Sequence, residues 1–166
     1  MILLTGATGK IGSALAKRLA GPTYRTRALV RSPDRALGLR RTGIDIAVGD
    51  LSLPDSLDRA LEGVSALFLL APAGPGMVEL EVNAIGAASR ARVELIVKLS
   101  APGAHPRAHL GIGRWHGEIE EHLTASGSHI PSSGRRTSCR TSWSSRRRST
   151  HTEVFRPRRA MQESIW

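Results

Sequence analysis

The sequence predicts an α/β fold for residues 1–127, a doubly wound parallel sheet of about five strands with helices on both faces. Three observations lead to this prediction. Short apolar runs alternate with amphipathic segments, the connections between them are short, and no internal repeat is visible. Alternating strands and helices of this kind are typical of βαβ units, whose strands run parallel.

Each element follows from a local pattern. In the first helical segment Ile11, Leu15 and Leu19 share one face, and in the last Ile119 and Leu123 continue a stripe from Trp115, as amphipathic helices require. We expect helices near residues 10–20, 33–41, 55–62, 76–91 and 115–126. The short apolar runs predict strands at Ile2–Thr5, Arg27–Val30, Asp45–Val48, Ala66–Leu70 and Glu94–Leu99.

Residues 128–166 differ sharply from the rest of the chain. The 166 residues include 24 Lys and Arg against 14 Asp and Glu, a net charge of +10. Residues 1–127 account for +3 of this charge, and residues 128–166 for +7, with nine arginines and nine serines. The apolar residues of this tail follow no period, and low hydrophobicity with high net charge predicts a segment without regular structure.

Composition also excludes several classes of protein. No apolar run reaches the length of about eighteen residues that a transmembrane helix needs, so we expect no membrane partner. The single cysteine, Cys139, excludes a disulfide framework and a cysteine-built zinc site, and we expect no metal. Since the first residues show no secretory signal, the sequence predicts a cytoplasmic protein.

The strongest functional signal is the glycine-rich turn Thr5–Gly12, TGATGKIG, between the first strand and the first helix. Its glycines, Gly6, Gly9 and Gly12, have separate tasks: a tight turn, close approach of a pyrophosphate to the backbone, and close packing of helix on sheet. The helix N-terminus then offers N–H groups and a positive dipole end to phosphates. A purely structural turn is the alternative. The pattern favours a Rossmann-like dinucleotide site.

The end of the second strand bears on cofactor choice. An acidic residue there would hold the ribose hydroxyls of NAD, but this chain has Arg31 followed by Ser32. A guanidinium and a hydroxyl suit the 2′-phosphate of NADP, so we expect NADP in preference to NAD. The alternative is a solvated arginine.

Two further strand ends fall at the same edge of the predicted sheet. Asp50 and Leu51 follow the third strand, and Asp50 could accept a hydrogen bond from the adenine amino group or serve as a turn residue. Ala71 follows the fourth strand in a loop of small residues that could line the dinucleotide.

Residues 1–127 resemble the NmrA-like family of atypical short-chain dehydrogenases. The resemblance lies in TGATGKIG at 5–12, RALVR at 27–31, VGDL at 48–51, LFLLAP at 67–72, IVKLSA at 96–101 and RWHGEIEEHL at 114–123. It implies a Rossmann domain that binds NADP or NAD and a smaller C-terminal substrate lobe. It also implies cofactor contacts from Gly6, Thr8, Gly9, Lys10, Ile11, Gly12, Arg31, Asp50, Ala71 and Ser100.

The catalytic residues are less clear from the sequence. Short-chain dehydrogenases use a Tyr-x-x-x-Lys pair, but the only tyrosine, Tyr24, has no lysine four residues later. His116 occupies the position where some relatives have a lysine, and an imidazole can donate a proton. The alternative is a surface histidine. Lys98 is a second candidate, although strand alternation could point it away.

Many family members have glycine in place of Arg92, which predicts a slightly strained turn.

The family pattern stops near Gly127. Relatives continue with Leu-Pro-Tyr-Thr-Ile-Leu-Arg-Pro, which would form a sixth strand. If residues 128–135 are read one base earlier, their codons permit these same amino acids in order, and residues 137–141 permit Asn, Phe, Met, Gln and Asn. We therefore hypothesise a frameshift near codon 127, which makes 1–127 an incomplete Rossmann domain and 128–166 an out-of-frame tail.

Three functions remain open at this point. The first is an NAD(P)H-dependent oxidoreductase acting on a small carbonyl or quinone-like substrate, impaired by loss of the substrate lobe. The second is a non-catalytic NADP-binding redox sensor, which the missing Tyr-x-x-x-Lys pair favours. The third, less favoured, is a Rossmann module with a basic tail that binds nucleic acid. The sequence assigns neither the substrate nor the oligomeric state.

Overall fold

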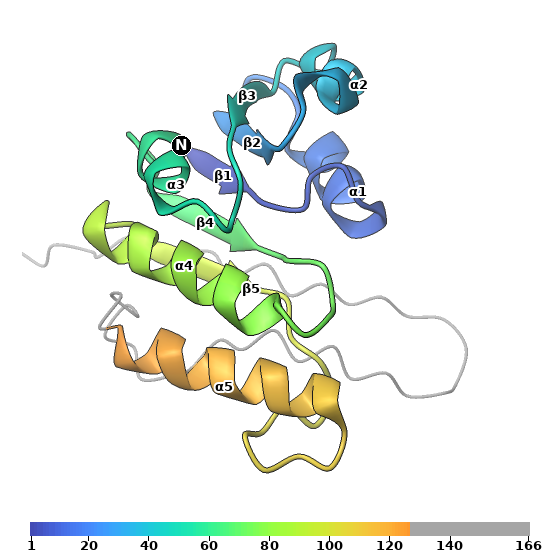
Figure 1. The fold of residues 1–166 in the computed structure, drawn as a ribbon. Helices are drawn as coiled ribbons and strands as arrows, with labels where there is room; N and C mark the ends of the chain where they lie inside the picture. Colours follow the sequence, from blue (N-terminus) through green and yellow to red (C-terminus); the bar gives the residue numbers. More distant parts are fainter. Residues whose placement is uncertain (127–166) are drawn as a thin grey trace, which may run out of the picture.

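The computed structural model describes residues 1–126, which form one parallel five-stranded sheet with helices on both faces (Figure 1). The strand order is β3-β2-β1-β4-β5, and all four neighbouring pairs are parallel. The strands are β1 (Ile2–Leu4), β2 (Thr26–Val30), β3 (Asp45–Val48), β4 (Ala66–Leu69) and β5 (Leu95–Lys98).

This strand order creates a crevice next to β1. The chain builds β1, β2 and β3 in one direction and then returns to place β4 on the other side of β1. The loops that follow β1 and β4 therefore diverge at the carboxyl edge of the sheet. In open α/β sheets, this is where ligands bind.

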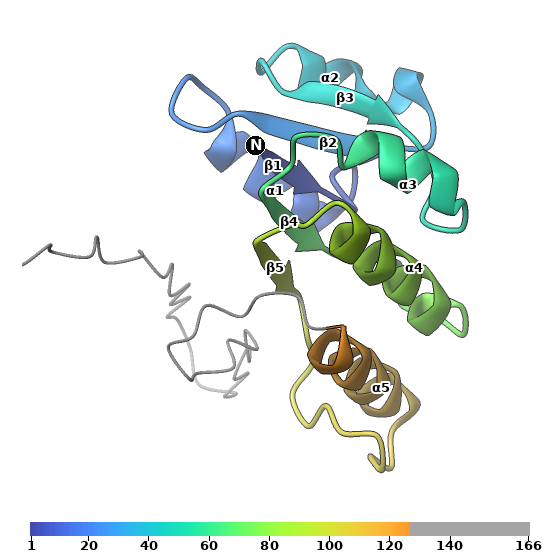
Figure 2. The same cartoon turned by 90° about the vertical axis from the view of Figure 1, so that its left-hand side faces the viewer.

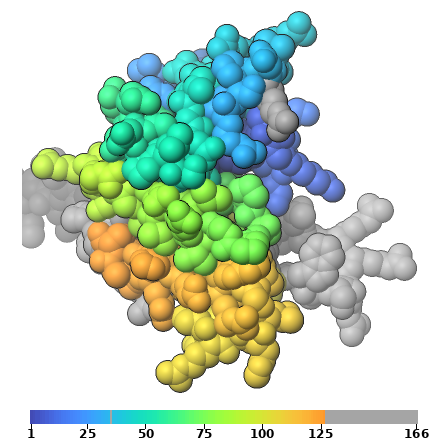
Figure 3. All heavy atoms as spheres, viewed as in Figure 1, coloured from blue at the N-terminus to red at the C-terminus, as the bar shows by residue number. Residues whose placement is uncertain are grey.

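The helices divide between the two faces of the sheet. α1 and α2 pack on one face, and α3, α4 and α5 lie in a row on the other (Figure 2). In the space-filling view α4 lies in a continuous surface between α3 and α5 (Figure 3). Their bounds are α1 (Lys10–Leu19), α2 (Leu37–Arg40), α3 (Pro54–Ala60), α4 (Met77–Arg90) and α5 (Gly111–Ala125), with a 3-10 turn over Pro33–Ala36.

Two hydrophobic cores result, because successive strand residues face opposite sides of the sheet. Leu3 of β1 packs under α3, α4 and α5 with residues such as Leu67 and Ile119, whereas its neighbour Leu4 packs under α1 and α2 with residues such as Ala16. Both leucines are almost fully buried. The doubly wound parallel sheet expected from the sequence is confirmed.

The predicted boundaries needed two corrections. The segment expected as a single helix over 33–41 is a 3-10 turn followed by the short helix α2. The last helix begins at Gly111, four residues before the predicted start, despite the low helix propensity of glycine. Gly113 is buried, and a Cβ there would lie 2.9 Å from the Cβ of Ala108 and 3.2 Å from the carbonyl oxygen of Gly103. Close packing against the preceding loop therefore explains the glycine.

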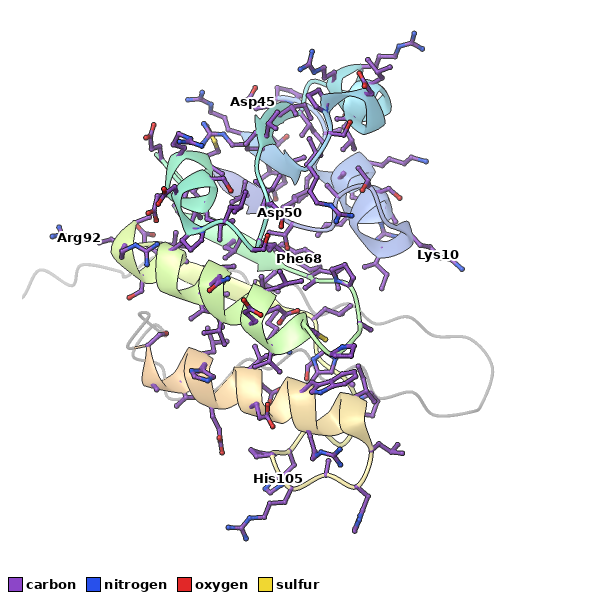
Figure 4. The ribbon with its side chains drawn as sticks, in the orientation of Figure 1. Lys10, Asp45, Asp50, Phe68, Arg92 and His105 are labelled. Carbon is purple, nitrogen blue, oxygen red and sulfur yellow. The ribbon has the colours of Figure 1, made fainter. Side chains whose placement is uncertain are left out.

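Arg92 adopts the strained conformation expected from the sequence. Its φ is +54°, and within residues 1–126 it is the only non-glycine residue with a positive φ. Arg92 lies just after α4, on the opposite side of the molecule from Lys10 at the start of α1 (Figure 4). The strain therefore lies far from the crevice.

The face of β5 that points away from α4 and α5 is partly uncovered. Leu95 and Val97 are 45% and 37% exposed, whereas Ile96 and Lys98 alternate with them and point toward the helices. Among residues 1–126, no helix is long and apolar enough to cross a membrane.

Candidate functional site

An open groove of about 430 Å³ lies at the carboxyl edge of the sheet, where β1 and β4 diverge. A neighbouring opening of about 480 Å³ continues it toward the end of β2 and is lined by Thr8, Val30, Arg31 and Ser32. The residues that line the main groove are Thr5, Gly6, Thr8, Gly9, Lys10, Ile11, Leu29, Val30, Arg31, Gly49, Asp50, Leu51, Leu70, Ala71, Pro72 and Leu80.

The glycine turn is shaped as the sequence predicted. Gly6 has φ +63°, which favours glycine, and the nearby Leu70 leaves little room for a side chain. A Cβ on Gly12 would lie 2.1 Å from the carbonyl oxygen of Gly6, so a side chain there would push α1 away from the turn. Gly12 itself is buried and does not line the groove.

The start of α1 is open to an anionic ligand. Gly9 is the N-cap, no side chain caps the helix, and no acidic residue lies in the first turn. The positive end of the helix dipole is therefore uncompensated beside the groove. Lys10 is exposed, and its side chain points outward from the start of α1 (Figure 4).

Thr5 fixes the two strands that flank the groove. Its hydroxyl donates to the Leu70 carbonyl oxygen (3.0 Å) and accepts from the Leu70 N–H (2.7 Å). Because Thr5 is buried, these bonds join the ends of β1 and β4 away from water. This role of Thr5 was not predicted from the sequence.

Asp50 forms a local turn at the groove wall. Its Oδ1 accepts hydrogen bonds of 2.9 Å from both the backbone N–H and the hydroxyl of Ser52. The Ser52 backbone bond is the main cause that lowers the pKa of Asp50, and the charge of Arg31 adds to it. The carboxylate is therefore ionised at neutral pH. The turn expected as one alternative is present. An adenine contact stays a prediction.

A second cluster of polar residues lies behind this wall, between α4, β5 and α5. Lys98 Nζ is 2.7 Å from His116 Nδ1 and 3.7 Å from Glu81 Oε2, and all three residues are buried. The Ala71 N–H, in the groove wall, donates to Glu81 Oε1 (3.2 Å). The structure thus brings the two candidate catalytic residues together, and His116 is not the surface residue considered as an alternative.

Burial shifts the pKa values of this cluster. It raises the pKa of Glu81 to about 7, against the opposing effect of the Lys98 charge. Burial also lowers the pKa of Lys98, against the attraction of Glu81. The pKa of His116 falls to about 4, first because of burial and then because of the positive charge of Lys98. His116 is therefore neutral at physiological pH.

Most of the predicted cofactor residues gather at the groove, and two lie elsewhere. Ser100 is buried, and its hydroxyl donates to Glu120 Oε1 of α5 (2.5 Å). Gly12 shapes the turn from behind. The other ten line the groove or its extension: Gly6, Thr8, Gly9, Lys10, Ile11, Arg31, Ser32, Asp50, Leu51 and Ala71.

Glu81 was not predicted from the sequence. The signal was present, because Met77, Glu81, Ala84, Ile85 and Ala88 recur at helical spacing, and an acidic residue on such an apolar face needs a buried partner. Within residues 1–126 no group of three or more His, Cys, Asp or Glu side chains could hold a metal ion.

Comparisons with known proteins agree with this geometry. The sequence profile of the NAD(P)H-binding family matches residues 6–129. The chain is 38% identical over 127 residues to the NAD(P)H azoreductase of Xenophilus azovorans, covering 76% of this chain and 44% of that protein. The chain thus spans less than half the length of this curated relative.

Solved structures of two reductases have the same fold. An Escherichia coli NADPH-dependent quinone oxidoreductase in complex with NADPH superposes with a TM-score of 0.69 at 32% identity, over 76% of this chain and 46% of the other. The triphenylmethane reductase of Citrobacter sp. in complex with NADP(H) superposes with a TM-score of 0.71 at 26% identity. The match covers 77% of this chain and 46% of the other. The chain therefore belongs to the NAD(P)H-binding family, as its NmrA-like motifs implied, and its cofactor is NADP or NAD.

Proposed function

We propose that this chain binds NADP(H) in preference to NAD(H), with the pyrophosphate at the Gly6–Gly12 turn and the 2′-phosphate at Arg31 and Ser32. The observation that supports the preference most is the position of Arg31, which lines both the main groove and its extension. A dinucleotide site is supported because the groove and its extension reach from the glycine turn to Arg31 and Ser32, and an uncapped helix N-terminus flanks them.

We further propose that the chain descends from an NAD(P)H-dependent oxidoreductase for a small carbonyl or quinone-like substrate. A bound reduced nicotinamide supplies a hydride to such a substrate. His116 would give a proton to the substrate oxygen, with Lys98 behind the imidazole. Ala71 and Leu51 would line the cofactor, and the contact of Ser100 with the cofactor stays a prediction.

We expect turnover by this chain to be impaired. Hydride transfer needs a closed pocket that excludes water and aligns the substrate. The frameshift hypothesis places the substrate lobe outside the encoded sequence, and the tail at 128–166 lies outside the residues that the structure describes. That the Rossmann domain ends at residue 127 is part of the same frameshift proposal.

A non-catalytic redox sensor is the second candidate function. The absence of a Tyr-x-x-x-Lys pair at Tyr24 favours it. NADPH oxidation against a panel of quinones separates the two: saturable turnover supports the oxidoreductase, and cofactor binding without turnover supports the sensor.

The cofactor preference is tested by replacing Arg31 with alanine. Loss of a charged hydrogen bond costs about 1.5–3 kcal/mol, so the Kd for NADP should rise about 10–150-fold while the Kd for NAD changes little. Arg18→Ala is the matched control, since Arg18 is exposed in the last turn of α1, at the end opposite the groove. Tighter binding of NAD than NADP by the unmodified chain would overturn the preference.

A further inference from the structure

Glu81 links the wall of the cofactor groove to the buried pair of Lys98 and His116. Its Oε1 accepts from the Ala71 N–H (3.2 Å), and its Oε2 faces Lys98 Nζ at 3.7 Å. The side chain is fully buried on α4, one residue after Leu80, which lines the groove. A buried carboxylate with one direct hydrogen bond is costly unless a nearby charge compensates it.

The contacts of Lys98 define the protonation of His116. An ammonium group has three donors and no acceptor. Lys98 Nζ lies 2.7 Å from His116 Nδ1, 3.3 Å from the Leu99 carbonyl oxygen and 3.7 Å from Glu81 Oε2. Nδ1 of His116 must then accept, so the proton of the neutral imidazole is on Nε2.

Other charged groups near Lys98 do not take the place of Glu81. Glu120 of α5 contributes a weaker attraction to Lys98, and its Oε1 accepts from the Ser100 hydroxyl. Within residues 1–126 the one ion pair of Lys98 is with Glu81. Above its pKa of about 7, Glu81 is therefore the anion that can hold the ammonium in the orientation in which it donates to His116.

We propose that Glu81 is a positioning residue, which holds Lys98 charged and directed at Nδ1 of His116 and so makes the imidazole a neutral Nε2–H donor. The use of this donor rests on the proposed oxidoreductase function. In that reaction a bound NAD(P)H would give its hydride to the carbonyl carbon and be oxidised to NAD(P)+, and the Nε2 proton would go to the carbonyl oxygen. Nδ1 takes a proton from Lys98, and the resulting amine is later reprotonated from water.

The test is imidazole nitrogen NMR on the full 166-residue chain at pH 8 without cofactor, because nitrogen shifts distinguish the two tautomers and the cation. We expect the His116 proton on Nε2. In Glu81→Gln the tautomers should mix and the pKa of His116 should rise by about one unit or more, because Lys98 gives up its proton more easily without its anion. Glu79→Gln, at an exposed position on the same helix, should leave both unchanged.

Two results would overturn the proposal. The first is a proton on Nδ1 in the unmodified chain, a result that is informative even if Glu81→Gln does not fold. The second is a folded Glu81→Gln chain with an unchanged His116 tautomer and pKa. Since these spectra are recorded without dinucleotide, failure of NADP binding in a separate titration would count against the proposed function alone.

Discussion

At the scale of single residues, Gly12 and Asp50 mark what a sequence motif can and cannot predict. The spacing of the glycines predicted a turn and a close helix, and the geometry of Gly6 and Gly12 confirms both. A backbone motif can be predicted because few residues tolerate those conformations. The bond from Ser100 to Glu120 depends on a side-chain partner that only the folded chain brings near. The Asp50 turn involves Ser52, two residues away, and was one of two predicted alternatives.

The first prediction concerns Gly12. We expect Gly12→Ala to lower the free energy of unfolding by about 1–3 kcal/mol, because the new methyl group overlaps the backbone of Gly6. Dinucleotide affinity should fall as well, since the turn moves. Urea denaturation and cofactor titration measure the two effects.

Gly86→Ala is the matched control. Gly86 lies inside α4, and the nearest atom to a new Cβ would be the flexible end of Arg90, at 3.7 Å. Alanine there should stabilise the chain by about 0.5–1 kcal/mol. Equal effects of the two substitutions would contradict the packing argument.

At the scale of elements, α4 and β5 are joined by a polar contact within an otherwise apolar interface. The periodicity of α4 predicted its buried face, but Glu81 on that face was missed because its partner Lys98 lies 17 residues later, on a strand. The early start of α5 was missed for a related reason, since the glycines at 111 and 113 weaken helix propensity and only the packing of the loop explains Gly113.

The pH dependence of stability tests the burial of Glu81 at this contact, because burial is the main cause of its raised pKa. The pKa of Glu81 is raised from 4.5 to about 7, so its stabilising contribution is fully present below 4.5 and is lost as the pH rises through 7. The free energy of unfolding of the unmodified chain should therefore exceed that of Glu81→Gln by more at pH 5 than at pH 8, on the order of 1–3 kcal/mol.

His116 acts in the opposite sense. Its pKa is lowered from 6.5 to about 4, so its contribution is present above 6.5 and is lost as the pH falls through 4. Glu81→Gln should also raise the pKa of His116, so the two chains differ in both contributions, and the raised pKa of Glu81 gives the larger part of the difference between pH 5 and pH 8. A difference that is the same at both pH values would be inconsistent with a raised pKa.

At the scale of the whole molecule, the charge of +10 separates into two unequal parts. Residues 1–127 carry +3, and the family match ends at residue 129. The family match assigns a dinucleotide cofactor to the described part of the chain. The chain spans less than half the length of its curated relative. We interpret the remaining +7 as the product of a shifted frame rather than as a nucleic-acid surface.

The nucleotide sequence tests the frame hypothesis directly. We predict that adding or deleting one base near codon 127 opens a longer frame, which continues with Leu-Pro-Tyr-Thr-Ile-Leu-Arg-Pro or a close variant. Stop codons in both alternative frames soon after codon 127 would refute it. Expression of the corrected gene should also give NADPH oxidation with a quinone acceptor above that of the present chain.

The central claim is that the groove beside β1 holds NADP, and amide NMR of the full chain during NADP titration tests it most directly. We predict saturable shifts at residues 6–12, 31–32 and 71, on the carboxyl edge of the sheet, with Arg92 on the opposite side unchanged. A folded chain whose amides do not respond to NADP, or respond only around Arg92, would contradict the account.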